Sequence, residues 1–85
     1  MAAPAPYEDY AIARTAIRSA RDVDSARFSV ASWQKAEEAF HKGENAFKEN
    51  DFENAKKLFR IAKEHAESAE NQTRLKKFKS GDSFP

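Results

Sequence analysis

The stretch from Ala36 to Ala62 constrains the fold of this chain more than any other. Before the break at residues 50–51, small residues and phenylalanines recur along one potential helix face. After the break, Ala55, Phe59 and Ala62 follow at spacings of four and three. Such spacing places side chains on one side of an α-helix, and small residues between aromatic ones let two helices approach closely. The stretch therefore predicts two consecutive helices that fold back on each other as an antiparallel hairpin.

A further helix precedes this pair. Tyr10, Ala13, Ile17 and Ala20 form its inner stripe, and poor helix formers at residues 22–25 interrupt it. Ser29 is a suitable N-cap for the next helix, and Asn50-Asp51 supplies the turn after it. We therefore expect an all-α, antiparallel three-helix bundle. Its helices cover about residues 7–21, 30–49 and 52–79, with a flexible stub at 1–6 and a disordered tail at 80–85.

Gly43 lies in the middle of an expected helix, where glycine costs roughly 1 kcal/mol relative to alanine. Close approach of the third helix would compensate, with Phe59 or Ala55 filling the space. The core we expect from these patterns is aromatic, aliphatic and small: Tyr10, Ile17, Ala36, Phe40, Gly43, Phe47, Phe52, Ala55, Phe59 and Ala62.

Composition excludes several classes of function. The 85 residues contain no cysteine, so disulfides, thiol nucleophiles and thiolate metal sites are absent, and the net charge of +1 argues against obligate nucleic-acid binding. Glu38-x-x-His41 has the spacing of di-iron ligands, but a second such pair is missing from the sequence. No nucleophile, base and orienting group combine into a catalytic constellation. We therefore expect neither an enzyme nor a bound metal or cofactor.

One segment resembles a single tetratricopeptide repeat, a helical hairpin used in protein–protein interaction. The resemblance runs from Ala36 to about Glu67 and rests on Ala39, Gly43, Ala46, Asp51-Phe52, Ala55, Phe59 and Ala62. Lys42 stands where that motif usually has Leu, and no Pro closes the second helix near Glu67. The resemblance implies a tetratricopeptide-like hairpin. A lone repeat does not form the concave groove of an array, because stacked repeats build that surface.

From Tyr7 to about Ala69 the chain also resembles a small uncharacterised family of bacterial cell-envelope proteins. The resembling features are the Tyr10/Ala13/Ile17/Ala20 helix, the Trp33-x-x-Ala36-x-x-x-Phe40 run and the Asp51-Phe52-x-x-Ala55 helix start. Members are typically lipoproteins, sometimes fused to an OmpA-like peptidoglycan-binding domain. The resemblance implies a protein of the periplasm or envelope, anchored through an acylated cysteine upstream of Ala2 that this chain lacks. Without such an anchor we expect a cytoplasmic location.

A row of arginines on the first helix is one candidate contact surface. Arg14, Arg18 and Arg21 are spaced by four and three residues, so they lie on one helix face. They either form a solvated face or bind an acidic partner. Trp33 at the start of the second helix is a further candidate, because an exposed tryptophan there would be a strong binding anchor. A buried Trp33 would instead belong to the core.

The end of the third helix is the other candidate surface. Residues 71–85 hold four basic groups and one acidic group, and Lys76 and Lys77 lie in this segment. These cations either contact an anionic lipid, glycan or nucleic acid, or complement the negative end of the helix dipole.

Two apolar side chains, Leu75 and Phe78, lie in the same segment. An expected second helix of about 20 residues is too short to pair with this end of the third helix. They either cover Val23 and Phe28 in the loop between the first two helices, or present an apolar pair to a partner.

These observations favour a non-enzymatic protein-binding or scaffolding module of the bacterial cell envelope, a lipoprotein in its native form. Its partner would be another protein, of the outer membrane or cell wall. One alternative is a structural helical protein that self-associates. A second alternative is a reader of anionic surfaces that uses the basic end of the third helix. We expect no specific nucleic acid, and membrane contact only through the implied lipid anchor.

Overall fold

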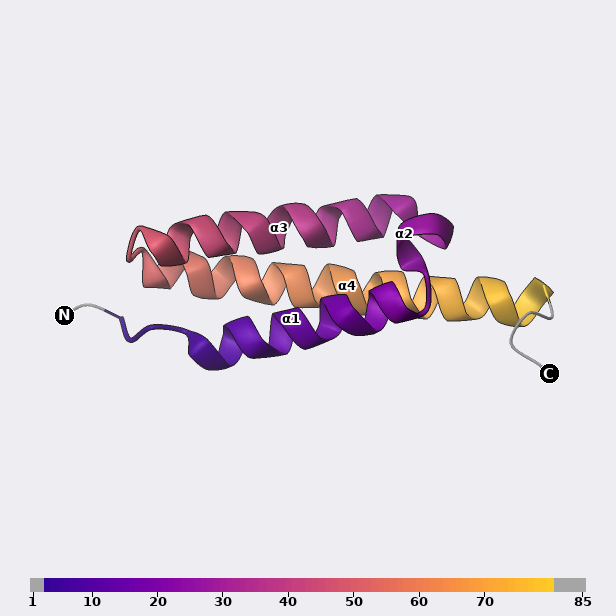
Figure 1. The fold of residues 1–85 in the computed structure, drawn as a ribbon, viewed down its shortest axis with the longest axis horizontal. Coiled ribbons are helices and arrows are strands. Elements are labelled where there is room, and N and C mark those ends of the chain that lie inside the picture. The colour runs from indigo at the N-terminus through magenta and orange to yellow at the C-terminus, as the bar shows by residue number, and fades with distance from the viewer. Residues whose placement is uncertain (1–2, 81–85) are drawn as a thin grey trace.

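The computed structural model describes residues 3–80 and contains only helices and short connections over that range. Three long helices lie side by side: α1 (Tyr7–Asp22), α3 (Val30–Lys48) and α4 (Phe52–Ser80) (Figure 1). A short helix, α2 (Ser25–Phe28), connects α1 to α3. Helices α1 and α4 run in the same direction and α3 runs opposite to both, as Figure 1 shows. The prediction of an all-helical fold is confirmed.

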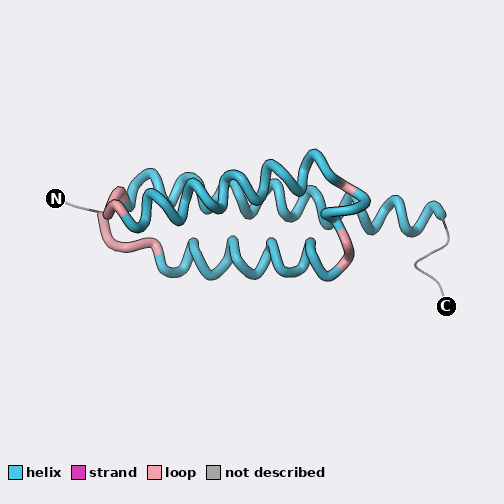
Figure 2. Tube along the Cα trace, turned by 45° about the horizontal axis from the view of Figure 1, so that its top comes forward, coloured by secondary structure: helices cyan, strands magenta, loops and turns pink. Residues whose placement is uncertain are grey.

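Helix α4 is the element on which the other two long helices pack. Helices α1 and α3 each contact α4 far more than they contact each other. The buried stripe of α4 consists mostly of alanine, which brings little bulk between helix axes: Ala55, Phe59, Ala62, Ala66, Ala69 and Thr73. The result is an elongated molecule of 53 × 19 × 13 Å, in which α1 lies to one side of the α3–α4 pair (Figure 2).

The turn between α3 and α4 has the hydrogen bonds of a Schellman motif. Asn50 adopts the left-handed conformation, with φ 61°, as its place in the sequence predicted. Its amide donates to the Phe47 carbonyl at 3.0 Å, and the Asp51 amide donates to the Ala46 carbonyl at 2.8 Å. Both carbonyls belong to the last turn of α3, which would otherwise leave them without partners. Phe52 then packs edge-on against Phe47, with ring centroids 5.4 Å apart.

Gly43 is buried where α3 meets α4, and the expected close approach is confirmed. A Cβ atom added at Gly43 would lie 2.7 Å from Cε1 and 2.8 Å from Cδ1 of Phe59. The Phe59 ring therefore occupies the space that any other residue at position 43 would need. The same ring contacts Tyr10 and Phe40, with centroid separations of 5.4 and 5.7 Å.

The link from α1 to α3 is more structured than the sequence indicated. Asp24, which directly precedes α2, adopts the left-handed conformation, with φ 72°, and its carbonyl accepts the amides of Arg27 and Phe28 to start α2. Ser29 precedes α3 as expected, but its side chain makes no capping hydrogen bond. Its hydroxyl instead lies 2.8 Å from the Thr73 hydroxyl on α4, because the side chain is turned into the interior.

Ser25 joins the same buried contact. Its hydroxyl is also 2.8 Å from that of Thr73, so one threonine hydroxyl binds two serine hydroxyls. All three residues are buried, with exposed fractions of 0–3%. This hydroxyl triad, Ser25, Ser29 and Thr73, ties both ends of α2 to α4.

The predicted core divides into a buried part and a half-buried part. Ile17, Ala36, Gly43, Ala55, Phe59 and Ala62 are buried, whereas Tyr10, Phe40, Phe47 and Phe52 are half-buried. The half-buried members are aromatic residues that face the space between α1 and α3 or the turn. Trp33 is only 7% exposed and belongs to the core. It is therefore not an exposed binding anchor, and Arg21 of α1 lies over its ring.

The ends of the chain differ in part from expectation. Pro6 is buried, and its carbonyl accepts the Tyr10 amide at 3.0 Å, so the chain is already held at residue 6. Ser80 is the last residue of α4, and its hydroxyl donates to the Lys77 carbonyl. The expected disordered tail lies, from residue 81 onward, outside the described residues, as do residues 1–2.

Candidate functional site

Two neighbouring hollows lie between α1 and α3, whose backbones seldom come close to each other. Each helix lines the hollows with one row of side chains, spaced by three and four residues in the sequence. The α1 stripe is Tyr7, Tyr10, Arg14, Arg18 and Arg21, and the α3 stripe is Glu37, His41, Glu44 and Lys48. These two stripes form the opposite edges of one surface, which we call the α1/α3 groove.

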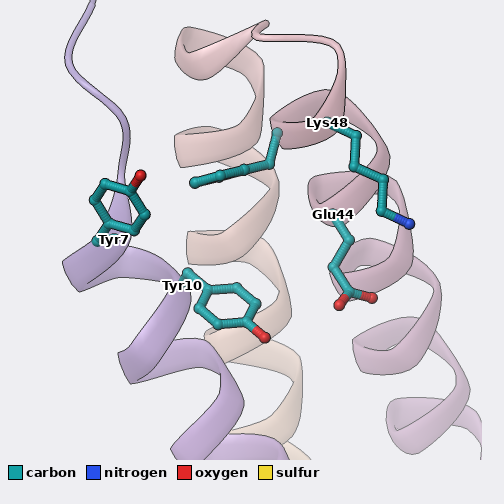
Figure 3. Close-up of a pocket in the computed structure, with 5 residues that line it drawn as sticks. Tyr7, Tyr10, Glu44 and Lys48 are labelled. Atoms are coloured by element: carbon teal, nitrogen blue, oxygen red, sulfur yellow. The ribbon is translucent and has the colours of Figure 1, made fainter.

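The first hollow has a volume of about 260 Å³ and lies near the α3–α4 turn. Tyr7 and Tyr10 line it from α1, and Phe47, Glu44 and Lys48 line it from α3 (Figure 3). The Tyr7 ring meets Phe47 edge-on at 5.4 Å, although Tyr7 itself is 69% exposed. We call this space the aromatic hollow, because three rings form most of its wall.

The second hollow, of about 180 Å³, lies further along the groove toward α2. All three arginines of the predicted stripe line it, together with Glu37 and His41 from α3. Ile17 and Phe40 provide its apolar floor. Between the two hollows the Tyr10 and Phe40 rings stack at 5.6 Å and bridge α1 to α3. We call this second space the basic hollow.

The groove carries an excess of positive charge. Four cationic side chains line it, against two carboxylates, Glu37 and Glu44. Arg14 and Arg18 make no ion pair within residues 3–80, whereas Arg27, Arg60 and Arg74 each have a carboxylate partner. Guanidinium groups without a partner beside an apolar floor are suited to bind carboxylates from another molecule.

Arg21 differs from the other two arginines. Its guanidinium lies over the Trp33 ring, 5.8 Å from the centroid, and so it stacks on the core tryptophan. A cation over an indole face is held in place by the ring quadrupole. Trp33 thus contributes to the groove indirectly, by orienting Arg21, and not as an exposed contact.

The end of α4 projects beyond α2, as Figure 1 shows. Leu75 and Phe78 are 54% and 59% exposed there, so they are not buried against Val23 and Phe28. The contacts with Phe28 come instead from lysines: Lys76 donates to its carbonyl, and Lys77 lies 5.4 Å from its ring centroid. Of the two alternatives for Leu75 and Phe78, the one in which they cover this loop is therefore wrong.

More of the cations in this segment contact other groups of the chain than the sequence suggested. Arg74 binds Glu70 through two nitrogens, at 2.8 and 3.0 Å. With Lys76 and Lys77 held on Phe28, three of the four cations at this end have partners within the chain. A carboxylate partner, as at Arg74, reduces the attraction of a cation to an anionic surface, whereas the contacts of Lys76 and Lys77 restrict these side chains without removing their charge.

Glu38 and His41, the residues with metal-ligand spacing, bind other side chains. Glu38 accepts a hydrogen bond from Lys42 at 2.9 Å, and this hydrogen bond, with the charge of the ammonium group, lowers the pKa of the Glu38 carboxyl. His41 Nδ1 lies 3.2 Å from Glu44 Oε1. Over residues 3–80 no group of three or more His, Asp and Glu side chains converges as metal ligands would. In the same range no helix has the length and apolarity needed to span a membrane.

A family model matches residues 8–80, which include all four helices and both walls of the groove except Tyr7. The chain belongs to the DUF4398 family. The family is described as a domain of unknown function. Neither the curated proteins nor the solved structures contain a significant match to the chain. The function of this DUF4398 domain therefore has to be inferred from its own geometry.

The sequence identified one wall of the groove in the DUF4398 domain but not the other. The arginine stripe was a candidate from its spacing, whereas Tyr7, Glu37, Glu44 and Lys48 were not. The sequence nevertheless contained a periodic pattern that could have identified these four residues. Tyr7 and Tyr10 extend the arginine stripe by spacings of three and four, and Glu37, His41, Glu44 and Lys48 recur at four, three and four. Only the packing of both helices on α4 shows that these two stripes border the same space.

Proposed function

We propose that this chain is a non-enzymatic protein-binding module, which holds its partner in the α1/α3 groove. The observation that carries the proposal is the pair Arg14 and Arg18, which have no ion-pair partner among residues 3–80, beside a groove with an aromatic floor. Protein interfaces are enriched in arginine and aromatic side chains. The groove is shallow and formed by two rigid helices, which suits contact with another protein better than enclosure of a small substrate.

The scaffold we propose for this module is a tetratricopeptide-like hairpin of α3 and α4, with α1 packed beside it. The Schellman turn at Asn50 and the contact of Gly43 with Phe59 support this assignment, because that motif brings two helices together through small residues. Helix α1 packs beside this hairpin, mainly on α4. The binding surface then lies between α1 and α3 and not on a concave array face.

Two alternatives receive less support from the geometry. Three of the four cations at the end of α4 are engaged within the chain, which weakens the interpretation of residues 74–79 as a reader of anionic surfaces. The alanine stripe of α4 is already fully buried by α1 and α3, so obligate self-association is not needed to close the core. Sedimentation equilibrium at micromolar concentration separates the monomer that we expect from an obligate assembly.

Charge reversal in the groove tests the binding proposal. We expect the Arg14→Glu/Arg18→Glu variant to weaken partner binding at least tenfold, because charged contacts that are lost and reversed at an interface cost about 2–5 kcal/mol. Photo-crosslinking residues placed at position 44 in the groove and at position 57 outside it identify the partner in the native cell, and titration calorimetry with the purified partner gives the affinity.

The matched control is Lys56→Glu/Lys57→Glu, an equal change of charge at exposed positions of α4 outside the groove. This control should bind like the wild type. Equal losses for both variants would show that net charge, and not the groove, governs binding. Crosslinks that form only from positions outside the groove would contradict the proposed site.

We also propose that the native protein is a lipoprotein of the bacterial cell envelope, as its resemblance to that class of proteins implies. The expected result is an acylated N-terminus upstream of Ala2 on protein purified from native membranes. Intact-mass spectrometry of separate membrane and soluble fractions measures it. An unmodified protein found only in the soluble fraction would contradict the anchor and would direct the search for partners to the cytoplasm.

A further inference from the structure

We infer that the occupant of the α1/α3 groove is an acidic amphipathic α-helix of the partner, with carboxylates that meet Arg14 and Arg18 and one large apolar side chain that fills the aromatic hollow. This inference rests on the proposed function and adds the chemistry and shape of the partner. Shape, anchor and charge support it separately.

The shape of the groove suits a helix. Its two walls are helices that both pack on α4 and whose backbones seldom come close to each other, so side chains such as Tyr10 and Phe40 form the floor of the seam between them. Side chains of a third helix can enter such a seam as ridges enter a groove, and amphipathic helices commonly bind in this way. From Tyr7 to Arg18 the seam spans twelve residues of α1, or roughly 16 Å at about 1.5 Å per residue. A partner helix of about three turns covers it.

The aromatic hollow sets the apolar anchor. Its volume of about 260 Å³ is small for a whole organic ligand but sufficient for one aromatic or branched aliphatic side chain. Tyr7, Tyr10 and Phe47 surround the space, and the Tyr10 hydroxyl is directed toward α3 in Figure 3. Large side chains that enter such partly desolvated hollows supply most of the binding energy at protein interfaces.

The charges define the polar side of the partner. Arg14 and Arg18 are one helical turn apart, so carboxylates spaced by three or four residues on a facing helix can meet them both. Each guanidinium can bind a carboxylate through two parallel hydrogen bonds. Acidic residues one to three turns from the apolar anchor therefore match the distance between the two hollows.

The opposite wall disfavours a uniform polyanion. Glu37 and Glu44 line the groove from α3, and they would repel a nucleic acid or an anionic membrane pressed along its length. A helix avoids this repulsion, because it can turn its acidic side to α1 and a neutral or basic side to α3. The asymmetry of charge across the groove thus favours a protein helix over a polyanion.

Selection from a randomised library of helical peptides, displayed and panned against the intact protein, tests this inference without knowledge of the native partner. We expect the selected peptides to share two or more acidic residues on one side and a single large apolar residue about one to three turns away. Amide shifts in nitrogen–proton NMR spectra should then be confined to the two groove stripes. The best peptide should lose at least tenfold in affinity for Arg14→Glu/Arg18→Glu and keep its affinity for Lys56→Glu/Lys57→Glu.

A second variant pair tests the anchor. Phe47→Ala should weaken the same peptide at least fivefold, whereas Ile61→Ala, which removes an exposed apolar side chain on α4 outside the groove, should not. The spectrum of each variant shows whether it is folded. Phe47→Leu is available as a milder change of the hollow if Phe47→Ala unfolds the protein.

The outcomes separate this inference from the function on which it rests. Binders that map to the groove but carry no acidic consensus, or that bind in extended form, would overturn the acidic helix and leave the groove as a protein-binding site. A library that yields binders only on other surfaces, or none, would overturn the inference. Crosslinking in the native cell then decides independently whether the groove binds any protein.

Discussion

Phe59→Ala is expected to lower the free energy of unfolding by about 3–5 kcal/mol, the range found when large buried side chains are truncated. Phe59 is 1% exposed and is the largest side chain that the structure buries completely. It fills the space above Gly43 and contacts rings of both α1 and α3. Denaturant unfolding followed by circular dichroism gives the value. Since domains are typically stable by only ~5–15 kcal/mol, the loss is a large share of the total.

Phe40→Ala provides the control. Phe40 stacks on Tyr10 and contacts Phe59 but is half-buried, so its truncation should cost clearly less than that of Phe59. Equal losses for the two variants would contradict the central position assigned to Phe59. If Phe59→Ala fails to fold, Phe59→Leu gives a smaller loss that remains measurable.

Gly43→Ala tests the same contact, because its effect on the free energy of unfolding should have opposite signs in the wild type and in the Phe59→Ala background. In the wild type the added methyl group would meet the Phe59 ring at 2.7 Å, and overpacking of this kind costs about 1–3 kcal/mol, more than the roughly 1 kcal/mol that alanine adds in helix propensity. In the Phe59→Ala background the methyl group enters free space. We therefore expect Gly43→Ala to destabilise the wild type and stabilise Phe59→Ala. Changes of the same sign in both backgrounds would contradict the contact.

Thr73→Val is expected to produce the second large loss of stability. The substitution keeps the shape of the side chain but removes the hydroxyl that binds both Ser25 and Ser29. Each buried serine hydroxyl left without a partner costs about 1–3 kcal/mol. Thermal unfolding should show a lowered midpoint, and amide hydrogen exchange should increase most in α2 and the first turn of α3.

Two further variants show whether the loss arises from unsatisfied hydroxyls. Thr73→Ser retains the hydroxyl and loses one methyl group, so it should be much less destabilising than Thr73→Val. The triple variant Ser25→Ala/Ser29→Ala/Thr73→Val removes all three hydroxyls and should recover part of the stability, because no buried polar group is left unpaired. A triple variant less stable than Thr73→Val alone would show that packing, and not hydrogen bonding, is the main contribution.

Most of the helical arrangement followed from local patterns. Asn50 tolerates a left-handed conformation, and the stripe at Ala55, Phe59 and Ala62 has the spacing of a helix face, so turn and helix were both predictable. The short helix α2 was not. Its residues Ser25–Phe28 carry no apolar repeat, and the helix depends on the left-handed Asp24 and on contacts with Thr73, 48 residues from Ser25 in sequence.

The candidate site was predictable only on one side. The spacing of Arg14, Arg18 and Arg21 places them on one face whatever surrounds that face, so the sequence sufficed for the stripe. Whether Trp33 was exposed depended on how α1 covers the start of α3. Likewise, the groove needs α1 and α3 to pack on α4 with little contact between them, and no local pattern contains that information.

The sequence by itself determined the three long helices, the turn at Asn50 and the close approach of the third long helix at Gly43, because these depend on backbone preferences and on the periodicity of neighbouring residues. The tertiary structure decided which polar groups are buried and which cations remain unpaired. It turned the Ser29 hydroxyl away from the helix end toward Thr73, and it engaged Lys76 and Lys77 on Phe28. It also left Arg14 and Arg18 open beside the Tyr10–Phe40 pair. The physical reason is that burial and pairing are relations between residues far apart in the chain, and only the packing of α1 and α3 on α4 brings those residues together.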